Sequence, residues 1–326
     1  MRGPGGALRI GTRSSALAIW QTERVRELLH AAGQATQRVE IKTTGDLTPD
    51  VPLARIGSRA LFTKQIDDAL LDHRIDLAVH SLKDLPTELP SGITIAGIST
   101  REDARDALVG RGPLRWNQIP RGAVIATSSL RRRAQLLASR PDLQIVDVRG
   151  NVDSRLVKLD ARVDWTAIVL ATAGLVRLGL ADRIGERLPP NAMLPAPGQG
   201  ALAVTVRTDD PAVRESVRRA VHDAGTALQV AAERAFLRRL EGGCQVPVAA
   251  FAQPSTEDGV PWLDLHGRVI SLGGETMAEG HLMAVVGDEV AAASLGTTLA
   301  ENLIAEGAAS ILAEVRAATP PAVTEP

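Results

Sequence analysis

The segment "AVIATSSLRRRAQLLASRPDLQIVDV" (123–148) holds the pattern that decides the fold. Its two ends, "AVIAT" (123–127) and "LQIVDV" (143–148), are short apolar runs of the kind found in buried strands, and the residues between them follow a helical pattern. A strand, a helix and a second strand in this order predict a βαβ unit with parallel strands. The segment therefore predicts an α/β fold.

The same alternation continues on both sides. A predicted helix over 151–161 and a strand over 166–172 follow the segment. A separate block nearer the N-terminus has predicted helices over 14–33 and 61–74 and predicted strands over 8–12, 38–44, 75–81 and 93–99. Ser14 or Ser15 is placed to cap its first helix, and Gly33 to end it. We therefore expect two α/β domains with mostly parallel sheets, joined by a charged connector over 99–116.

The rest of the chain has a different organisation. A Pro- and Gly-rich linker (188–200) leads to a strand over 201–207, which we expect to return to the first sheet because it follows a linker rather than a helix. After about residue 222, a long helical pattern (226–240) and grouped strands predict a small α+β third domain. The expected division is domain 1 over 1–100 plus 200–220, domain 2 over 101–199, domain 3 over 221–318 and a tail over 319–326.

Composition excludes several classes of protein. Lys and Arg total 37 against 38 for Asp and Glu, so the formal net charge of −1 argues against a nucleic-acid binder. No run reaches the roughly 18 apolar residues of a membrane span, and the first residues lack the apolar core of a signal peptide. The single cysteine fits a reducing compartment. We expect a cytoplasmic protein that binds neither nucleic acid nor membrane.

Four polar clusters follow predicted strands, where ligands bind in open α/β sheets. The cluster at 127–132 also lies at a helix N-terminus, where backbone N–H groups favour anions and hydroxyls and guanidinium groups strengthen that preference. The four clusters comprise Arg13 and Ser15; Ser81, Lys83 and Asp84; Thr127, Ser128 and Ser129 with Arg131 and Arg132; and Arg149 with Arg155. The predicted ligand carries several carboxylates or phosphates.

Simpler interpretations of these residues stay open. The arginines at 131–133 could form a solvated helix face, although guanidinium groups oppose the helix dipole there and so suggest a ligand that offsets the cost. Asp84 could pair with Lys83 or cap a turn, and His80 could satisfy a backbone group. The six histidines show no HxxxH or HExxH spacing, so no metal site is expected, and no GxGxxG or GxxxxGK[ST] motif supports nucleotide binding.

Cys244 lies in "RRLEGGCQVPVAA" (238–250), between a predicted helix and a strand. It could be an inert small hydrophobic residue. A hydrolase nucleophile would favour a helix N-terminus or a partner histidine, and Cys244 follows a helix C-terminus with no histidine near it in sequence. It could also be a covalent tether, a thiol on a short rigid loop that is alkylated once. This last interpretation accounts for the Gly-Gly break.

With these residues in view, the chain resembles the hydroxymethylbilane synthase family, also called porphobilinogen deaminases. The matching motifs, which run in order along the chain, are "RIGTRSSALA", "AVHSLKDLPTELP", "TSSLRRRAQL", "RGNVDSRLVKLD", "LPAPGQGALAV" and "ERAFLRRLEGGCQVPVAAFA". The resemblance implies two domains like those of periplasmic binding proteins around a cleft, plus a small α+β C-terminal domain. It also implies a monomer.

The resemblance implies a function for Cys244 and Asp84. Cys244 would carry a dipyrromethane cofactor through a thioether and thereby prime the addition of four porphobilinogen molecules, each losing ammonia, to give hydroxymethylbilane. Asp84 would be the catalytic carboxylate. The residues implied at the cofactor are Lys83, Asp46, Ser81, Thr127, Ser128, Ser129, Arg131, Arg132, Arg149, Gly150 and Gln199. Those implied at the substrate are Arg13, Ser15, Phe62, Arg149, Arg155 and Arg59.

The chain departs from the family in one loop and leaves rival functions to weigh. Where the family often has "GGKGLF", this chain reads "ARIGSRALFTKQ" (54–65), so Arg55, Arg59 and Lys64 keep the positive charge of the loop but do not match its individual contacts. A solute-binding protein for a polycarboxylate is one rival, but it gives no use to Cys244 or Asp84. A nucleic-acid binder that uses the arginine run is another, and the scarcity of aromatic residues for base stacking counts against it.

Overall fold

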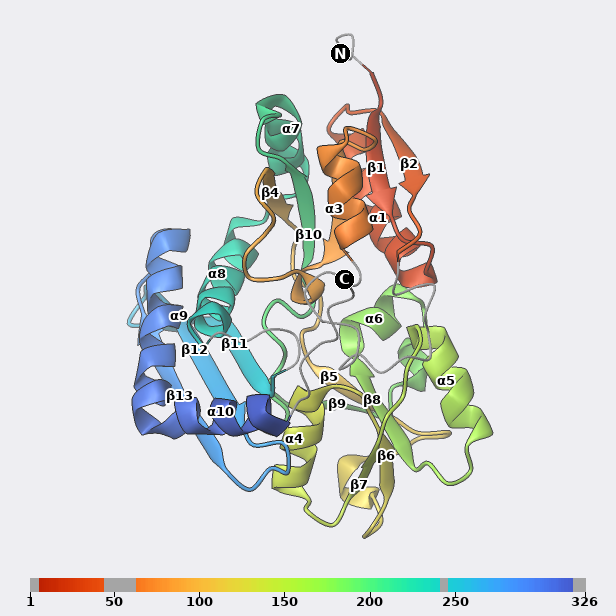
Figure 1. The fold of residues 1–326 in the computed structure, drawn as a ribbon, viewed down its shortest axis with the longest axis vertical. Coiled ribbons are helices and arrows are strands. Elements are labelled where there is room, and N and C mark those ends of the chain that lie inside the picture. Colours follow the sequence, from red (N-terminus) through yellow and green to blue (C-terminus); the bar gives the residue numbers. More distant parts are fainter. Residues whose placement is uncertain (1–5, 44–62, 241–245, 319–326) are drawn as a thin grey trace.

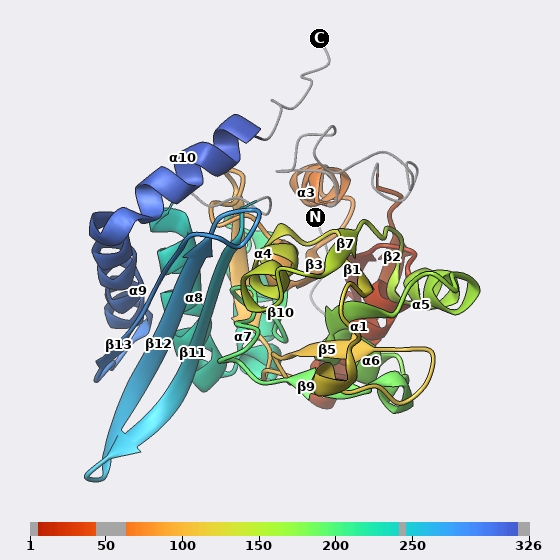
Figure 2. The same ribbon diagram turned by 90° about the horizontal axis from the view of Figure 1, so that it is seen from below.

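The computed structural model describes residues 6–43, 63–240 and 246–318. Two five-stranded sheets lie one beyond the other along the molecule, and a three-stranded sheet with long helices lies beside them (Figure 1). Viewed at right angles, α8 and α9 cover one face of the three-stranded sheet (Figure 2). The fold therefore has the expected α/β class, with two sheet domains and a third domain that combines a sheet with helices.

The first sheet has the strand order β2-β1-β3-β10-β4. Strand β1 is parallel to β2 and β3, whereas β10 is antiparallel to β3 and β4. The strand after the Pro/Gly linker does return to this sheet. The bounds are β1 Leu8–Thr12, β2 Thr36–Glu40, β3 Leu77–Ser81, β4 Ile93–Ile98 and β10 Leu202–Arg207, with helices α1 Ala16–Ala31, α3 Lys64–Leu71 and α7 Pro211–Val221.

The second sheet repeats this design with the order β7-β6-β8-β5-β9. Strand β6 is parallel to β7 and β8, and β5 is antiparallel to β8 and β9. The bounds are β5 Asp106–Val109, β6 Val124–Ala126, β7 Gln144–Val146, β8 Ala167–Ala171 and β9 Glu186–Leu188, with helices α4 Leu130–Ser139, α5 Val152–Ala161 and α6 Thr172–Arg177.

Two expectations about these sheets were wrong. The sheets are mixed rather than mostly parallel, because β10 and β5 each enter between neighbours of opposite direction. The segment 99–116 is also not just a connector, since Asp106–Val109 forms the fully buried strand β5. Its charged first residue hid it, because a buried carboxylate is rare unless it is paired.

The third domain packs helices against an antiparallel sheet. Phe236 of α8, Leu265 of β12 and Leu299 of α9 lie in one buried apolar cluster. Gly296 allows α9 to approach the α8 backbone, since a Cβ there would collide with the Ala232 carbonyl oxygen. The bounds are α8 Ala224–Arg239, β11 Val248–Glu257, β12 Val260–Ile270, β13 Met277–Ala284, α9 Glu289–Leu303 and α10 Ala309–Ala318.

Two serines cap helices that follow strands, and the cap by Ser15 was predicted. Ser15 caps α1 by accepting a hydrogen bond from the Ala18 N–H, and Ser129 caps α4 by accepting from the Arg132 N–H. Both helices start directly after a strand, so their N-termini lie at the sheet edge where a ligand is expected. Among the helices in the described ranges, none has the length and apolar character that a bilayer crossing requires.

Candidate active site

A cavity of about 90 Å³ lies between the first two domains. Its walls come from α1, the end of β3 and the short helix Leu82–Asp84 that follows it, α4, α5, α6 and the linker at 199–201. Four cationic residues contribute to it, namely Lys83, Arg132, Arg155 and Arg177, and no Asp or Glu of the described residues does. The cavity is therefore built for negatively charged groups.

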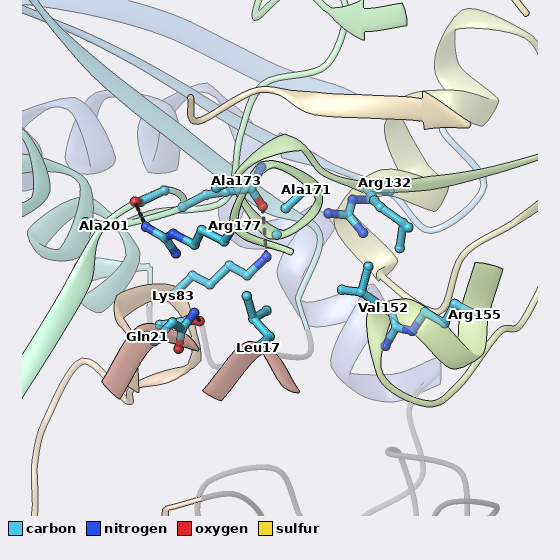
Figure 3. Close-up of a pocket in the computed structure, with 15 residues that line it drawn as sticks. Leu17, Gln21, Lys83, Arg132, Val152, Arg155, Ala171, Ala173, Arg177 and Ala201 are labelled. Carbon is cyan, nitrogen blue, oxygen red and sulfur yellow. Dashed lines mark hydrogen bonds between the residues drawn. The ribbon is translucent and has the colours of Figure 1, made fainter. Parts of the chain in front are cut away.

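The cationic side chains converge from both domains. Figure 3 shows Lys83 reaching toward the space that Arg132 and Arg155 line from the opposite wall. The Arg177 guanidinium turns to the linker, where it donates to the Gly200 carbonyl oxygen at 2.6 Å and lies 5.7 Å from the centre of the Trp20 ring. Lys83 and Arg155 thus face the cavity, whereas Arg177 also holds its wall in place.

Burial weakens the hold of these groups on their protons. It is the main reason why the pKa of Lys83 is lowered to about 8, and the charge of Arg132 lowers it further while that of Asp84 raises it. Burial, with the Arg132 charge, also lowers the pKa of Arg155 to about 10. Positive charges crowded in a desolvated space gain from a bound anion. The cavity wall therefore carries an excess of positive charge that a negatively charged ligand would neutralise.

Asp106 neutralises the deepest part of this wall. Its fully buried carboxylate accepts from Arg131 Nη1 at 2.7 Å and from Arg132 Nε and Nη2 at 3.1 and 2.7 Å. Burial alone would raise the pKa of Asp106, but the charges and hydrogen bonds of the two arginines hold it well below its ordinary range. The anion that offsets the helix-dipole cost of Arg131 and Arg132 is thus part of the chain.

Gln199 connects this ion cluster to Lys83. Its Nε2 donates to Asp106 Oδ1 at 2.9 Å and to the Ala104 carbonyl at 2.7 Å, which directs its Oε1 to the Lys83 ammonium at 3.1 Å. Gln199 is 1% exposed, so this orientation has no competing solvent contact. The ammonium in one domain is therefore positioned by a carboxylate in the other.

Asp84 ends the short helix after β3 and is exposed. The negative charge of Asp84 raises the pKa values of Lys83 and Arg155, against the effect of burial. Asp84 is therefore close enough to these two cavity residues to act on their charges. The Lys83 ammonium donates to Gln199, and no ion pair found in the described part of the chain joins it to Asp84. The carboxylate therefore remains open to a ligand.

The predicted hydroxyl residues build the turn where strand meets helix. Thr127 Oγ1 accepts from the Ser129 N–H at 3.3 Å, and Ser128 Oγ bridges the Val148 N–H and C=O at 3.0 and 2.9 Å. Ser81 Oγ accepts from Gln21 Nε2 at 2.8 Å and lines the cavity. Each hydroxyl thus has a structural partner already, and its contact with a ligand stays a prediction.

The structure brings other predicted residues near the cleft without placing them in the cavity wall. Arg149 has a buried Nη1 without a hydrogen-bond partner among the described residues. Gly150 (φ +108°) presents its carbonyl to Arg155 Nε at 2.7 Å.

Burial lowers the pKa of His80 to about 4, and the charge of Arg13 adds to this effect. His80 bonds the Thr205 hydroxyl at 2.9 Å rather than a backbone group.

Several predictions fall outside the described residues or outside the cavity. Lys64 begins α3, is exposed and does not line the cavity. Cys244, Asp46, Arg55, Arg59 and Phe62 lie outside the described residues.

Sequence reasoning missed three residues that shape the cavity: Asp106, Arg177 and Gln21. Arg177 lies on the helix that directly follows β8, so its position after a strand end was an available signal. Gln21 lies one turn beyond Leu17 on α1, which an amphipathic pattern cannot distinguish from an ordinary polar position. Asp106 gave no signal because its partners lie far along the chain.

We expect Asp106→Asn to destabilise the chain by about 3–5 kcal/mol, because it leaves buried guanidinium charge without a full counter-charge. Asp164→Asn is the matched control, since Asp164 pairs with Arg162 on the surface. Urea unfolding of both variants measures the difference. Equal midpoints for the two variants would show that the buried cluster adds no more than a surface pair.

The whole chain also matches known proteins. The family model described as porphobilinogen deaminase, dipyromethane cofactor binding domain, matches residues 8–215, and the C-terminal domain model of the same enzyme matches 227–305. The porphobilinogen deaminase of Syntrophotalea carbinolica is 50% identical over 309 residues, which cover 94% of this chain and 95% of that protein. That of Rubrobacter xylanophilus is 49% identical over 315 residues, covering 97% and 99%.

Among solved structures, the methionine binding protein MetQ aligns with a TM-score of 0.44 and 12% identity, over 66% of this chain and 89% of that chain.

Proposed function

The chain belongs to the porphobilinogen deaminase family, and on that premise we propose that its cationic cleft holds the carboxylates of a dipyrromethane cofactor and of the growing pyrrole chain. As a member of this family, the protein is a transferase of tetrapyrrole biosynthesis that polymerises porphobilinogen. The family model that covers its first two domains is the one for the dipyrromethane cofactor.

The charge of the cleft carries this proposal. Each pyrrole ring of porphobilinogen carries an acetate and a propionate, so two linked rings are already a polyanion. Lys83, Arg132 and Arg155 line a space without described acidic side chains, and Arg149 keeps a buried donor unused. Carboxylates would restore the desolvated cations to their ordinary proton affinity and satisfy that donor. The described residues therefore fit the cofactor.

The proposed binding set is the one that the family resemblance implies, restricted to the residues that the structure describes. The proposed cofactor contacts are Lys83, Ser81, Thr127, Ser128, Ser129, Arg131, Arg132, Arg149, Gly150 and Gln199, and the proposed substrate contacts are Arg13, Ser15, Arg149 and Arg155. Arg131 is the most committed of these to the fold, since its Nη1 bonds both Asp106 and the Leu194 carbonyl at 2.7 Å. Arg155 is less committed to the fold and can contact a ligand. It lines the cavity, and its recorded hydrogen bond runs from Nε to a backbone carbonyl.

Attachment through Cys244 is part of the proposal. The residue itself lies outside the described ranges, but the elements on either side of it are fixed. Glu233 of α8, fully buried, accepts hydrogen bonds from the Ala252 N–H of β11 at 2.8 Å and from Arg101 Nη2 at 3.1 Å. It also accepts from the Gly198 N–H of the linker at 2.6 Å. This carboxylate ties the third domain to the linker that lines the cavity.

Asp84 supplies the proposed catalytic group. When bound, the dipyrromethane offers the free pyrrole carbon at which the polymer grows. Loss of ammonia makes the incoming porphobilinogen electron-poor and places positive charge on pyrrole nitrogen. Asp84 is an exposed carboxylate near the cations of the cavity. A carboxylate in this position stabilises that positive charge and can accept a proton.

The cavity is small for the proposed ligand. At about 90 Å³ it is below the roughly 300 Å³ at which small-molecule sites begin. Lys83 and Gln199 form one hydrogen bond across the cavity. We infer that this contact separates when linked pyrrole rings enter, and that the domains act as two rigid walls.

We also propose a domain division, a compartment and an oligomeric state. The domains are 1–100 with 200–220, 101–199, and 221–318, the last carrying Cys244. The chain acts in the cytoplasm as a monomer and uses no nucleic acid or membrane partner; its mass in solution, measured by light scattering, tests the oligomeric state.

We expect Asp84→Asn to lower the turnover of porphobilinogen by at least 10²–10³-fold, the scale of a group that stabilises transition-state charge. The cofactor stays attached in this variant, and intact mass verifies that. Glu88→Gln is the control, since Glu88 is an exposed carboxylate on the same segment. Near-normal turnover by Asp84→Asn would remove this residue from the mechanism.

We expect cofactor assembly on the apo chain to slow as the pH rises through about 8. Burial lowers the pKa of Lys83 to about 8, so the group is an ammonium below that pH and loses its attraction for carboxylates above it. The rate of mass gain during incubation with porphobilinogen gives the pH profile. Lys83→Arg keeps its charge and shifts the decline to higher pH; the same decline in both proteins would assign it to another group.

A further inference from the structure

The outer face of the third domain's sheet brings together two histidines and an aspartate. Along β12, Leu263 and Leu265 point into the buried core, so Asp264 and His266 point to the opposite face. His281 of β13 lies directly opposite His266 in the register of the two strands. Alternation along one strand and pairing across two strands thus place three potential metal ligands on one surface.

The contacts within this cluster leave one oxygen unsatisfied. Asp264 Oδ2 lies 2.9 Å from His266 Nε2, a hydrogen-bond distance. Asp264 Oδ1 is shielded from solvent and has no hydrogen-bond partner among the described residues, and the nearest charged group recorded for it, His281 Nδ1, is 3.6 Å away. A carboxylate oxygen kept from water without a donor is costly, and a cation between it and the imidazole removes that cost.

The two imidazoles are arranged in parallel. Their ring centroids are 5.2 Å apart and their planes differ by 14°. One nitrogen from each ring and one oxygen of Asp264 all lie within 4.8 Å of one another. An ordinary Asp–His pair on a sheet surface accounts for the contact of His266, but not for a second histidine stacked upon it and facing the unsatisfied oxygen.

We propose that Asp264, His266 and His281 bind one divalent transition-metal ion, with Zn²⁺ as its representative. Two imidazoles and one carboxylate are ligands that zinc takes in proteins, whereas Mg²⁺ and Ca²⁺ prefer oxygen alone. Bonds of about 2.0–2.2 Å from each donor require the donors to approach one another more closely. His281 is 62% exposed at its side chain, so it is free to rotate inward.

The ion fastens β12 to β13 and takes no part in pyrrole chemistry. None of its three ligands lines the cleft cavity. Because the ion binds the folded pair of strands and not the unfolded chain, it raises the stability of the third domain. The cluster has no HxxxH or HExxH spacing because its histidines come from two strands.

The test is a calorimetric titration of the metal-free, full-length chain, carrying no affinity tag, with zinc sulfate. We expect one equivalent of Zn²⁺ to bind, and His266→Ala, His281→Ala and Asp264→Asn each to weaken that binding at least 10-fold, since losing even an outer partner of a metal ligand costs about 10-fold or more. His30→Ala removes an exposed histidine of α1 and is the matched control. It leaves the titration unchanged.

Two further measurements distinguish zinc held by this cluster from zinc held by Cys244 or scattered over the surface. The variants keep the porphobilinogen turnover of the parent, because the side chains lie outside the cleft; added zinc raises the Tm above the zinc-free value in the parent and in His30→Ala alone. Equal zinc affinity in the parent and in a His266→Ala/His281→Ala double variant, which retains Cys244, would overturn the proposal. So would the lack of saturable binding to the parent.

Discussion

The buried carboxylate of Asp106 is the constraint on which the cleft depends. Two guanidinium groups from the first turn of α4 converge on it, and a helix N-terminus is the end of a helix where positive charge is least favourable. Without an internal counter-ion these arginines could not stay buried while the cleft is empty. With it, the wall stays folded and still presents positive charge through Arg155 and Lys83. The same carboxylate fixes Gln199, which in turn positions the Lys83 ammonium of the other domain. One anion thereby organises both walls.

A second buried carboxylate, that of Glu233, connects the third domain to the segments that join the first two. Glu233 holds Arg101, where the chain leaves the first domain, the Gly198 N–H, where it returns, and the Ala252 N–H of the third domain. Gly200 permits the close approach of the two linkers, because its backbone (φ +94°) faces the Glu102 carbonyl. The crossing points of the chain are thus held by buried polar contacts. That arrangement suits an enzyme whose ligand grows between its domains.

The sequence predicted the parts of this structure that depend on local patterns. Ser15 caps the helix that it was expected to cap, and the polar groups after β3 and β6, which lie in different sheets, follow the carboxyl ends of their strands as expected. What it missed depends on partners far apart in the chain. Strand β5 was hidden because Asp106 looks like a surface residue until Arg131 and Arg132 are placed beside it. The histidine cluster on β12 and β13 was hidden because strand register brings it together, and register is not visible in either strand alone.

The central claim is that the cleft serves a cofactor attached to Cys244, and the intact mass of the purified chain tests it most directly. The account predicts that the parent protein exceeds its sequence mass by one dipyrromethane, or gains that mass on incubation with porphobilinogen, and that Cys244→Ser does neither. A parent chain that stays unmodified after incubation, or a Cys244→Ser variant that gains the same mass, would contradict it.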